Sequence, residues 1–313
     1  MENKIQVLVI YHKNCMDGLA AAFIAKEALG DIFTLPLNYG EEETVYEKME
    51  ELGILISQVD IYFVDFSFKR NLMIELCSKV KRVVVIDHHK TAEENLKGLD
   101  KEIENIKIVF DMNKSGATLA YEYFDSDLKK ELFTYVEDRD LWKWELSLSK
   151  EISEALKLYI KPNNLESFKS VYENFYLSKY SFVGLALTQK LEQQVASKLK
   201  KVRDIKILDI NFKIINVSEN ISELGNAICS EYNTPAMLYF ITEENRVFCS
   251  FRSLDTLADV SVVAKSFGGG GHRNACGCSF ELNEFVELLN GSIIDYPCVV
   301  IENGVAVNSS TVN

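Results

Sequence analysis

The four histidines of this 313-residue chain all stand where a metal or phosphate site would need them. His88 and His89 follow Asp87 at the end of an apolar run, and His12 closes another such run. His272 ends a string of four glycines. A histidine placed by chance more often lies on the surface or is satisfied within a core. Four histidines at element ends, beside carboxylates or glycines, therefore indicate a polynuclear metal site that faces a phosphate.

Aspartates follow two further apolar runs. Ile61–Val64 leads to Asp65, and the strand-like run Phe133–Glu137 leads to Asp138. Divalent cations such as Mg²⁺ and Mn²⁺ prefer carboxylate oxygens, and an added imidazole favours Mn²⁺, Co²⁺ or Fe²⁺. Two such cations can clamp a phosphoryl group. Each aspartate alone is more often a helix cap, but caps do not require nearby histidines. The candidate ligands are His12, Asp17, Asp65, His88 and Asp138.

The charge and composition of the chain limit the kinds of binding partner that we expect. The net charge of −13 would repel long duplex nucleic acid, so a small anionic substrate is expected. No apolar run is long enough for a membrane helix, and no membrane partner is expected. Seven dispersed cysteines and a start that does not resemble a signal peptide favour reduced thiols and a cytoplasmic protein. The oligomeric state is left open, with a homodimer as one option.

The first part of the chain alternates short apolar runs with amphipathic stretches. This pattern predicts an α/β domain with a mostly parallel sheet and helices on both faces. The expected strands are Ile5–Tyr11, Ile32–Leu35, Ile61–Asp65, Val83–Asp87 and Ile106–Phe110. Ligands of such sheets bind at the carboxyl ends of the strands, so the polar residues there can converge.

The rest of the chain predicts a helical connector and a smaller α+β domain. The pattern is helical from Leu128 to about Arg203, with a long amphipathic stretch at Phe182–Val202, and short strands and helices follow from Ile205. We therefore expect a metal-binding catalytic domain at 1–180 and a connector at 181–204. A substrate-binding domain at 205–291 and a tail without assigned role at 292–313 would follow.

Several segments resemble the signatures of the DHH phosphoesterase superfamily. Asp87-His88-His89 resembles the Asp-His-His motif of this superfamily. The segment "FGGGGHRNACGCSF" at Phe267–Phe280 resembles the signature of the associated C-terminal domain. Its first, second and fourth motifs resemble "VLVIYHKNCMDGLAAAFIA", "VDFSF" and "VEDRDLW". The resemblance covers nearly the whole chain in the expected order, and it implies the fold described above.

The resemblance implies a role for each candidate. Two divalent cations would be held by His12, Asp17, Asp65, His88 and Asp138, with Asp65 as the bridging ligand. His89 would face the substrate phosphate, and Asp87 would orient the two histidines. Asp140 is the alternative to Asp138, although a structural or capping role is expected for it.

One position departs from the family pattern. The first aspartate of the family lies two residues before the second, and here that position is Cys15. A thiolate is a soft ligand that favours Zn²⁺, Fe²⁺ or Co²⁺. Cys15 is therefore either a direct ligand or a neighbour of a weaker first cation site, and both alternatives stay open.

The C-terminal glycine string suggests an anion cradle. Consecutive glycines let backbone N–H groups approach an anion closely, and a planar arginine suits a phosphate. The expected substrate contacts are Arg252, Ser253, Gly269, Gly270, Gly271, His272 and Arg273. A flexible glycine loop is the alternative.

We expect a metal-dependent phosphoesterase with two divalent cations, Mn²⁺ first and Mg²⁺, Co²⁺, Fe²⁺ or Zn²⁺ as alternatives. The resemblance implies attack of a metal-generated hydroxide on phosphate esters of nucleotides, short oligonucleotides or linear and cyclic dinucleotides. The alternatives are a polyphosphatase or pyrophosphatase, and a nucleotide-binding regulator without activity.

Overall fold

The computed structural model describes residues 6–292, 299–302 and 305–308, which belong to two compact units divided at Leu191/Glu192. The expected fold class, a parallel α/β sheet followed by a second α+β sheet, is confirmed. The division falls inside helix α10 (Leu177–Leu199), which takes up most of the connector expected at 181–204. Within the part of the chain described, no helix is both long and apolar enough to cross a membrane.

The first unit contains a five-stranded parallel sheet in the order β2-β1-β3-β4-β5. Its strands are β1 (Gln6–His12), β2 (Phe33–Leu37), β3 (Val59–Val64), β4 (Arg82–Asp87) and β5 (Ile106–Phe110). Strand β1 pairs with β2 on one side and β3 on the other, so the strand order reverses there. The carboxyl ends of β1 and β3 flank this reversal, which is where ligands of open α/β sheets bind.

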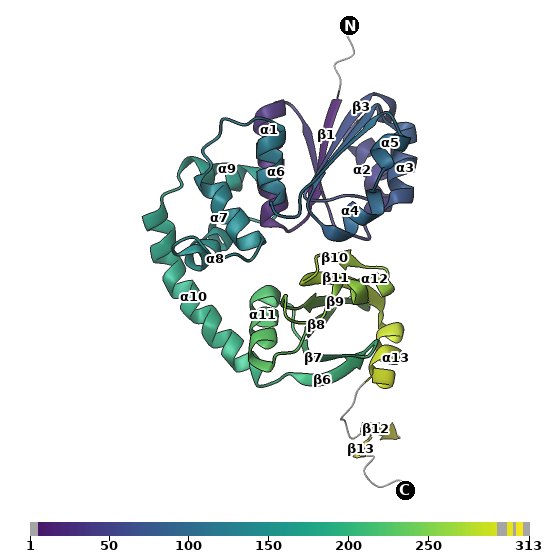
Figure 1. Cartoon of the computed structure of the whole chain (residues 1–313), viewed down its shortest axis with the longest axis vertical. Helices are drawn as coiled ribbons and strands as arrows, with labels where there is room; N and C mark the ends of the chain where they lie inside the picture. The colour runs from purple at the N-terminus through teal and green to yellow at the C-terminus, as the bar shows by residue number, and fades with distance from the viewer. Residues whose placement is uncertain (1–5, 293–298, 303–304, 309–313) are drawn as a thin grey trace. The chain divides into compact units, whose positions relative to one another are not determined.

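Helices cover both faces of this sheet, and Figure 1 shows α1 and α6 on one side with α2, α3 and α5 on the other. The first face packs on α1 (Met16–Leu29) and α6 (Gly116–Tyr123), and further helices, α7 (Glu131–Asp140), α8 (Ser149–Tyr159) and α9 (Leu165–Glu173), complete the same core by packing on these two and on one another. The second packs on α2 (Val45–Glu51), α3 (Arg70–Lys79), α4 (Lys90–Leu96) and α5 (Leu99–Glu102). Two 3₁₀ turns, η1 (Glu42–Thr44) and η2 (Ile56–Gln58), precede α2 and β3. Alternate residues of β1 belong to the two cores, so the strand is apolar from Val7 to Tyr11.

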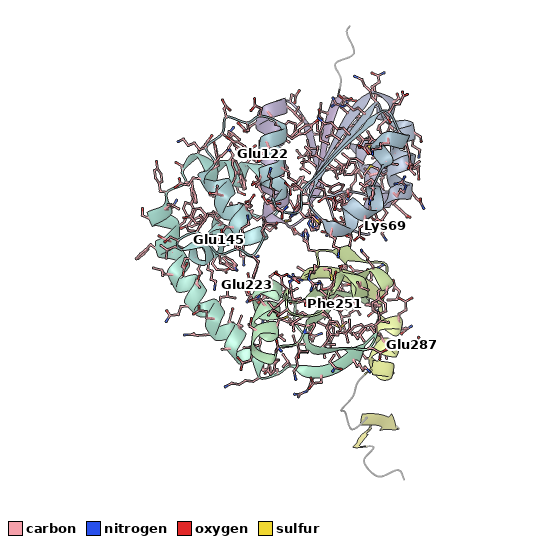
Figure 2. The ribbon with its side chains drawn as sticks, viewed as in Figure 1. Lys69, Glu122, Glu145, Glu223, Phe251 and Glu287 are labelled. Atoms are coloured by element: carbon pink, nitrogen blue, oxygen red, sulfur yellow. The ribbon has the colours of Figure 1, made fainter. Side chains whose placement is uncertain are left out.

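The second unit contains a mixed six-stranded sheet in the order β10-β11-β9-β8-β7-β6, in which β7 and β8 pair in parallel and the other neighbours pair antiparallel. Its strands are β6 (Arg203–Ile207), β7 (Ile210–Asn216), β8 (Ala236–Ile241), β9 (Arg246–Arg252), β10 (Gly270–Gly271) and β11 (Ala275–Glu281). Its helices are α11 (Ile221–Tyr232), α12 (Ser261–Ser266) and α13 (Leu282–Ser292). Phe251, labelled in Figure 2, is fully buried in the core that α12 and α13 cover.

One expectation on local structure needs correction. The run Phe133–Glu137, strand-like in composition, lies inside helix α7, where Phe133 and Val136 are buried at helical spacing. The tail contains an antiparallel pair, β12 (Val299–Glu302) and β13 (Val305–Asn308). Residues 293–298, 303–304 and 309–313 of the tail lie outside the described residues.

Helix α10 passes helix α8 at Gly184, and a side chain there would collide with the backbone of Glu151. Gly184→Val is therefore expected to lower the free energy of unfolding by about 1–3 kcal/mol. Ala186→Val, at an exposed position two residues further along α10, is the control. Thermal unfolding measures both, and equal melting temperatures would contradict the close packing.

Candidate metal centre

The candidate site lies where three neighbouring strands end. His12 is the last residue of β1, Asp65 follows β3, and Asp87 is the last residue of β4, with His88 and His89 directly after it. The carboxyl ends of parallel strands meet at one edge of the sheet, so these side chains converge as the sequence predicts. Apart from His12, all of them are buried.

Asp65 lies between the histidines. Its Oδ1 is 3.1 Å from His88 Nε2 and 3.9 Å from His89 Nδ1, and its Oδ2 is 3.8 Å from His12 Nδ1. The residue is 1% exposed, and Oδ2 has no hydrogen-bond partner within the described chain. A buried carboxylate oxygen without a donor is costly, so this atom needs a cation or another ligand.

Two glycines make room for Asp65. A Cβ on Gly18 of helix α1 would lie 3.0 Å from Asp65 Oδ2, and a Cβ on Gly116 of helix α6 would lie 2.6 Å from Asp65 Cβ. Asp65 itself has a left-handed backbone with φ of 55°. Both helices can therefore approach this carboxylate only because these positions lack side chains.

Asp17 is fixed by the start of helix α6. Its carboxylate accepts hydrogen bonds from Gly116 N at 2.5 Å and Ala117 N at 3.0 Å. A helix N-terminus stabilises negative charge, so α6 holds this side chain in place. Asp17 Oδ2 lies 3.8 Å from His88 Nε2, and Asp17 therefore belongs to the cluster, as predicted from its position in the first motif.

The structure places Asp140, the alternative to Asp138 in the sequence-based assignment, beside the histidines, and metal ligation by either aspartate stays a prediction. Asp140 Oδ2 lies 3.5 Å from His88 Nε2, and its carboxylate joins Asp17 and His88 in one group. Asp138 accepts a hydrogen bond from Glu145 N instead, at 2.9 Å. Residues two positions apart on a helix point in nearly opposite directions, so only one of the two aspartates can face the histidines.

Asp138 organises the loop that follows α7. Its carbonyl accepts from Lys143 N at 2.9 Å, and its carboxylate accepts from the backbone of Glu145, labelled in Figure 2. The loop carries Trp142 and Trp144, both with left-handed backbones, and their rings meet at 4.9 Å between centroids. Asp138 Oδ1 thus binds the loop, while its buried Oδ2 has no hydrogen-bond partner within the described chain.

Asp87 contacts the ring of His89 and the backbone of His88, and the role of orienting both histidines stays a prediction. It is fully buried, and its Oδ1 lies 2.7 Å from His89 Nδ1. The same oxygen accepts from the backbone N–H of His88 at 2.7 Å, and Ser67 Oγ donates to Oδ2 at 3.1 Å. These bonds fix both the tautomer and the direction of the His89 ring.

The cluster concentrates negative charge. Burial raises the pKa of Asp17 and Asp140, and the neighbouring carboxylates raise both further. Burial would lower the pKa of His88, but its bond to Asp65 and the charges of Asp140 and Asp17 raise that pKa to about 10. Carboxylates that share a buried site favour a cation between them, because it offsets their mutual repulsion.

The side chains form two groups with metal-ligand spacing. One contains His12, Asp65 and His89, the other contains Asp17, His88 and Asp140, and the ligand atoms within each group lie within 4.8 Å of one another. Carboxylate and imidazole donors suit Mn²⁺ and related cations. The residues therefore fit a metal centre, with Asp65 close to both groups.

Cys15 belongs to neither of these two groups, although it lies near their aspartates. It precedes helix α1, and burial raises the pKa of its thiol, with further contributions from Asp65, Asp140 and Asp17. A buried neutral thiol is inert unless a metal replaces its proton. Direct ligation by Cys15 stays a prediction.

The C-terminal candidates have partners inside their own unit. Gly269 N donates to Ala264 O at 2.8 Å and His272 N to Ala275 O at 2.8 Å, while Gly270–Gly271 is strand β10. The backbone N–H groups of Gly269 and His272 are therefore engaged within this unit, and contact of the glycine string with an anion stays a prediction. The glycines allow close strand packing, since a Cβ on Gly271 would lie 2.8 Å from Cys276 Cα.

The polar side chains of the other C-terminal candidates also form hydrogen bonds within the second unit. Arg273 Nη2 donates to Leu257 O at 2.9 Å and Ser253 Oγ to Ala258 O at 2.6 Å, so both hold the 253–259 loop. Arg252 Nη2 donates to Ser222 Oγ at 3.0 Å beside helix α11. Substrate contact by these residues stays a prediction.

Two aromatic side chains that the sequence did not single out lie beside the histidines. Tyr39 and Phe66 have ring centroids 5.5 Å and 6.1 Å from His12. Phe66 follows Asp65 in the second motif, and Tyr39 follows strand β2. Their places after strand ends are the signal that could have found them.

Two family models match the chain. The DHH family, N-terminal domain, matches residues 6–156, and the DHHA1 domain matches residues 180–295. The uncharacterized protein R106 of Acanthamoeba polyphaga mimivirus is 29% identical over 300 residues, covering 89% of this chain and 68% of that protein. Oligoribonuclease NrnB of Bacillus subtilis (strain 168) is 24% identical over 296 residues, covering 86% and 72%.

Solved structures share the fold. RecJ from Thermus thermophilus, in complex with Mn²⁺, has a TM-score of 0.51 at 14% identity and covers 91% of this chain and 51% of its own. An exopolyphosphatase-related protein from Bacteroides fragilis has a TM-score of 0.50 at 16% identity, with coverage of 93% and 92%. At these identities the likeness concerns the fold alone.

The contrast between Asp140 and Asp138 gives a testable prediction. Asp140→Asn is expected to weaken Mn²⁺ binding at least ~10-fold with little change in melting temperature, because it removes a ligand. Asp138→Ala should leave Mn²⁺ binding intact and destabilise the fold by about 1–3 kcal/mol, because it removes the side-chain acceptor for Glu145 N. Calorimetric Mn²⁺ titration and thermal unfolding measure both variants. The reverse pattern would restore Asp138 as the ligand.

Proposed function

Because the chain belongs to the DHH family of phosphoesterases and carries the DHHA1 domain, we propose that it hydrolyses phosphate esters of nucleotides, short oligonucleotides or dinucleotides. The observation that carries this proposal is the position of Asp65 between two histidine–carboxylate groups. A relative named an oligoribonuclease supports the substrate class. A cytoplasmic location stays a prediction from the dispersed cysteines.

Two divalent cations are proposed as cofactors, with Mn²⁺ first and Mg²⁺, Co²⁺, Fe²⁺ or Zn²⁺ as alternatives. His12 and Asp65 would hold one cation, and Asp17, His88 and Asp140 the other. Asp65 would serve both, since its two oxygens face different histidines. Its buried, unpartnered Oδ2 supports this assignment.

The chain's own residues would orient the reaction. Cations in such a site supply a nucleophile from water at neutral pH and offset charge on the phosphoryl oxygens. Burial lowers the pKa of His89, but Asp87 at Nδ1 raises it above its usual value, so the protonated ring would donate its Nε2–H to a phosphate oxygen. Arg252 and His272 of the second unit are proposed to contact the rest of the substrate.

A substrate panel tests the proposal directly. The protein is incubated with Mn²⁺ and a dinucleotide, a cyclic dinucleotide, pyrophosphate and polyphosphate, and the products are separated. Hydrolysis of the dinucleotides supports the proposal. Preference for polyphosphate or pyrophosphate would move the function to that class, and binding without turnover would indicate a regulator.

Asp87→Asn tests the orienting role of that residue. The amide keeps the shape but no longer fixes the His89 tautomer, so kcat on a dinucleotide is expected to fall by about 10²- to 10⁴-fold. Bound Mn²⁺ should be unchanged, because Asp87 lies outside both ligand groups. Ser67→Ala, which removes one bond to Asp87, is the graded control and should lower kcat less than ~10-fold. Metal loss in Asp87→Asn would contradict the assignment.

Asp65→Asn tests the shared ligand. A neutral amide cannot bring two cations together, so turnover should be lost and bound Mn²⁺ should fall while the circular dichroism spectrum stays native. Metal analysis after dialysis and the dinucleotide assay measure this. Activity within a few-fold of the unaltered protein would remove Asp65 from the site.

A further inference from the structure

The ring of Tyr39 borders the histidine cluster from the first unit itself. Tyr39 lies in the loop after strand β2, which is the neighbour of β1 in the sheet. Its centroid is 5.5 Å from that of His12 and 6.2 Å from that of His89. The residue is nevertheless 44% exposed, so part of the aromatic surface beside the site is open.

The loop around Tyr39 is held firmly. The Tyr39 ring packs on the fully buried Phe66 at 4.8 Å between centroids. Glu41 accepts from Asn38 N at 3.1 Å and from Lys13 Nζ at 3.0 Å. Glu42 accepts from Gly40 N at 2.8 Å, so the residues on both sides of the ring are fixed. The open aromatic surface is therefore presented in one position.

We propose that Tyr39 is the stacking surface for the nucleobase next to the hydrolysed phosphate, an inference that rests on the proposed function. Every base has a π-face, and stacking on an aromatic side chain tolerates any sequence. One sugar separates a base from its phosphate, so a base on Tyr39 leaves that phosphate near His12 and His89. In a chain of net charge −13, stacking supplies attraction that the overall electrostatics do not.

Ligands that differ only in the base test this role. Binding of AMP and of ribose 5-phosphate to the Mn²⁺-loaded protein is measured by calorimetry. Tyr39→Leu is expected to weaken AMP binding by about 10- to 100-fold and ribose 5-phosphate binding by less than ~2-fold. Tyr39→Phe keeps the ring and should bind both ligands within ~2-fold of the unaltered protein. Tyr176→Leu, at an exposed tyrosine between α9 and α10, is the matched control and should change neither.

Three outcomes overturn the stacking role. Equal weakening of both ligands in Tyr39→Leu would show that the ring supports His12 rather than a base. Unchanged AMP binding would show that no base contacts it. In both cases the unaltered protein still hydrolyses dinucleotides, so the proposed function survives. Absence of AMP binding to unaltered protein that cleaves dinucleotides would overturn the stacking role alone. Failure of the unaltered protein to cleave any phosphoester would instead remove the proposed function, and the stacking role with it.

Discussion

The gathering of four carboxylates at one sheet edge is the constraint on which the first unit depends. Asp17, Asp65, Asp87 and Asp140 surround His88 and His89 in a largely buried space. Two of them are stabilised by backbone N–H groups: Asp17 by the start of helix α6, and Asp87 by the turn at His88. Asp65 has no such donor at Oδ2 and is the carboxylate most in need of a cation.

Much of this arrangement follows from the sequence. Apolar runs that end in His12, Asp65 and Asp87 are strands whose carboxyl ends must meet, because a parallel sheet aligns them. The two-unit organisation follows from the change of pattern beyond Arg203. The roles expected for the individual site residues came from the family resemblance, because the spacing of the residues does not specify them. The family-model matches at 6–156 and 180–295 confirm the family.

Which residues face the histidines, and which are used for other hydrogen bonds, could not be predicted from the local sequence pattern. Asp138 and Asp140 are alike in sequence, and which one faces the histidines depends on the rotation of helix α7, set by its packing. The glycine string resembles an anion cradle, but the N–H of Gly269 closes the end of helix α12. Arg273 likewise holds a loop through its guanidinium. Such pairings are tertiary, so residue type alone cannot rank them.

The left-handed backbone of Asp65 also bears on how this chain would change over generations. A residue held at φ of 55° beside two close-packed glycines stores of order 1 kcal/mol, and its buried Oδ2 adds a desolvation cost. Glycine at this position would relieve both. The strained backbone and the unpartnered Oδ2 are therefore not favoured by folding, whereas Oδ1 stabilises the fold through its bond to His88. Descendants that are not under selection for catalysis could therefore keep the sheet and the helices as a folded protein without activity.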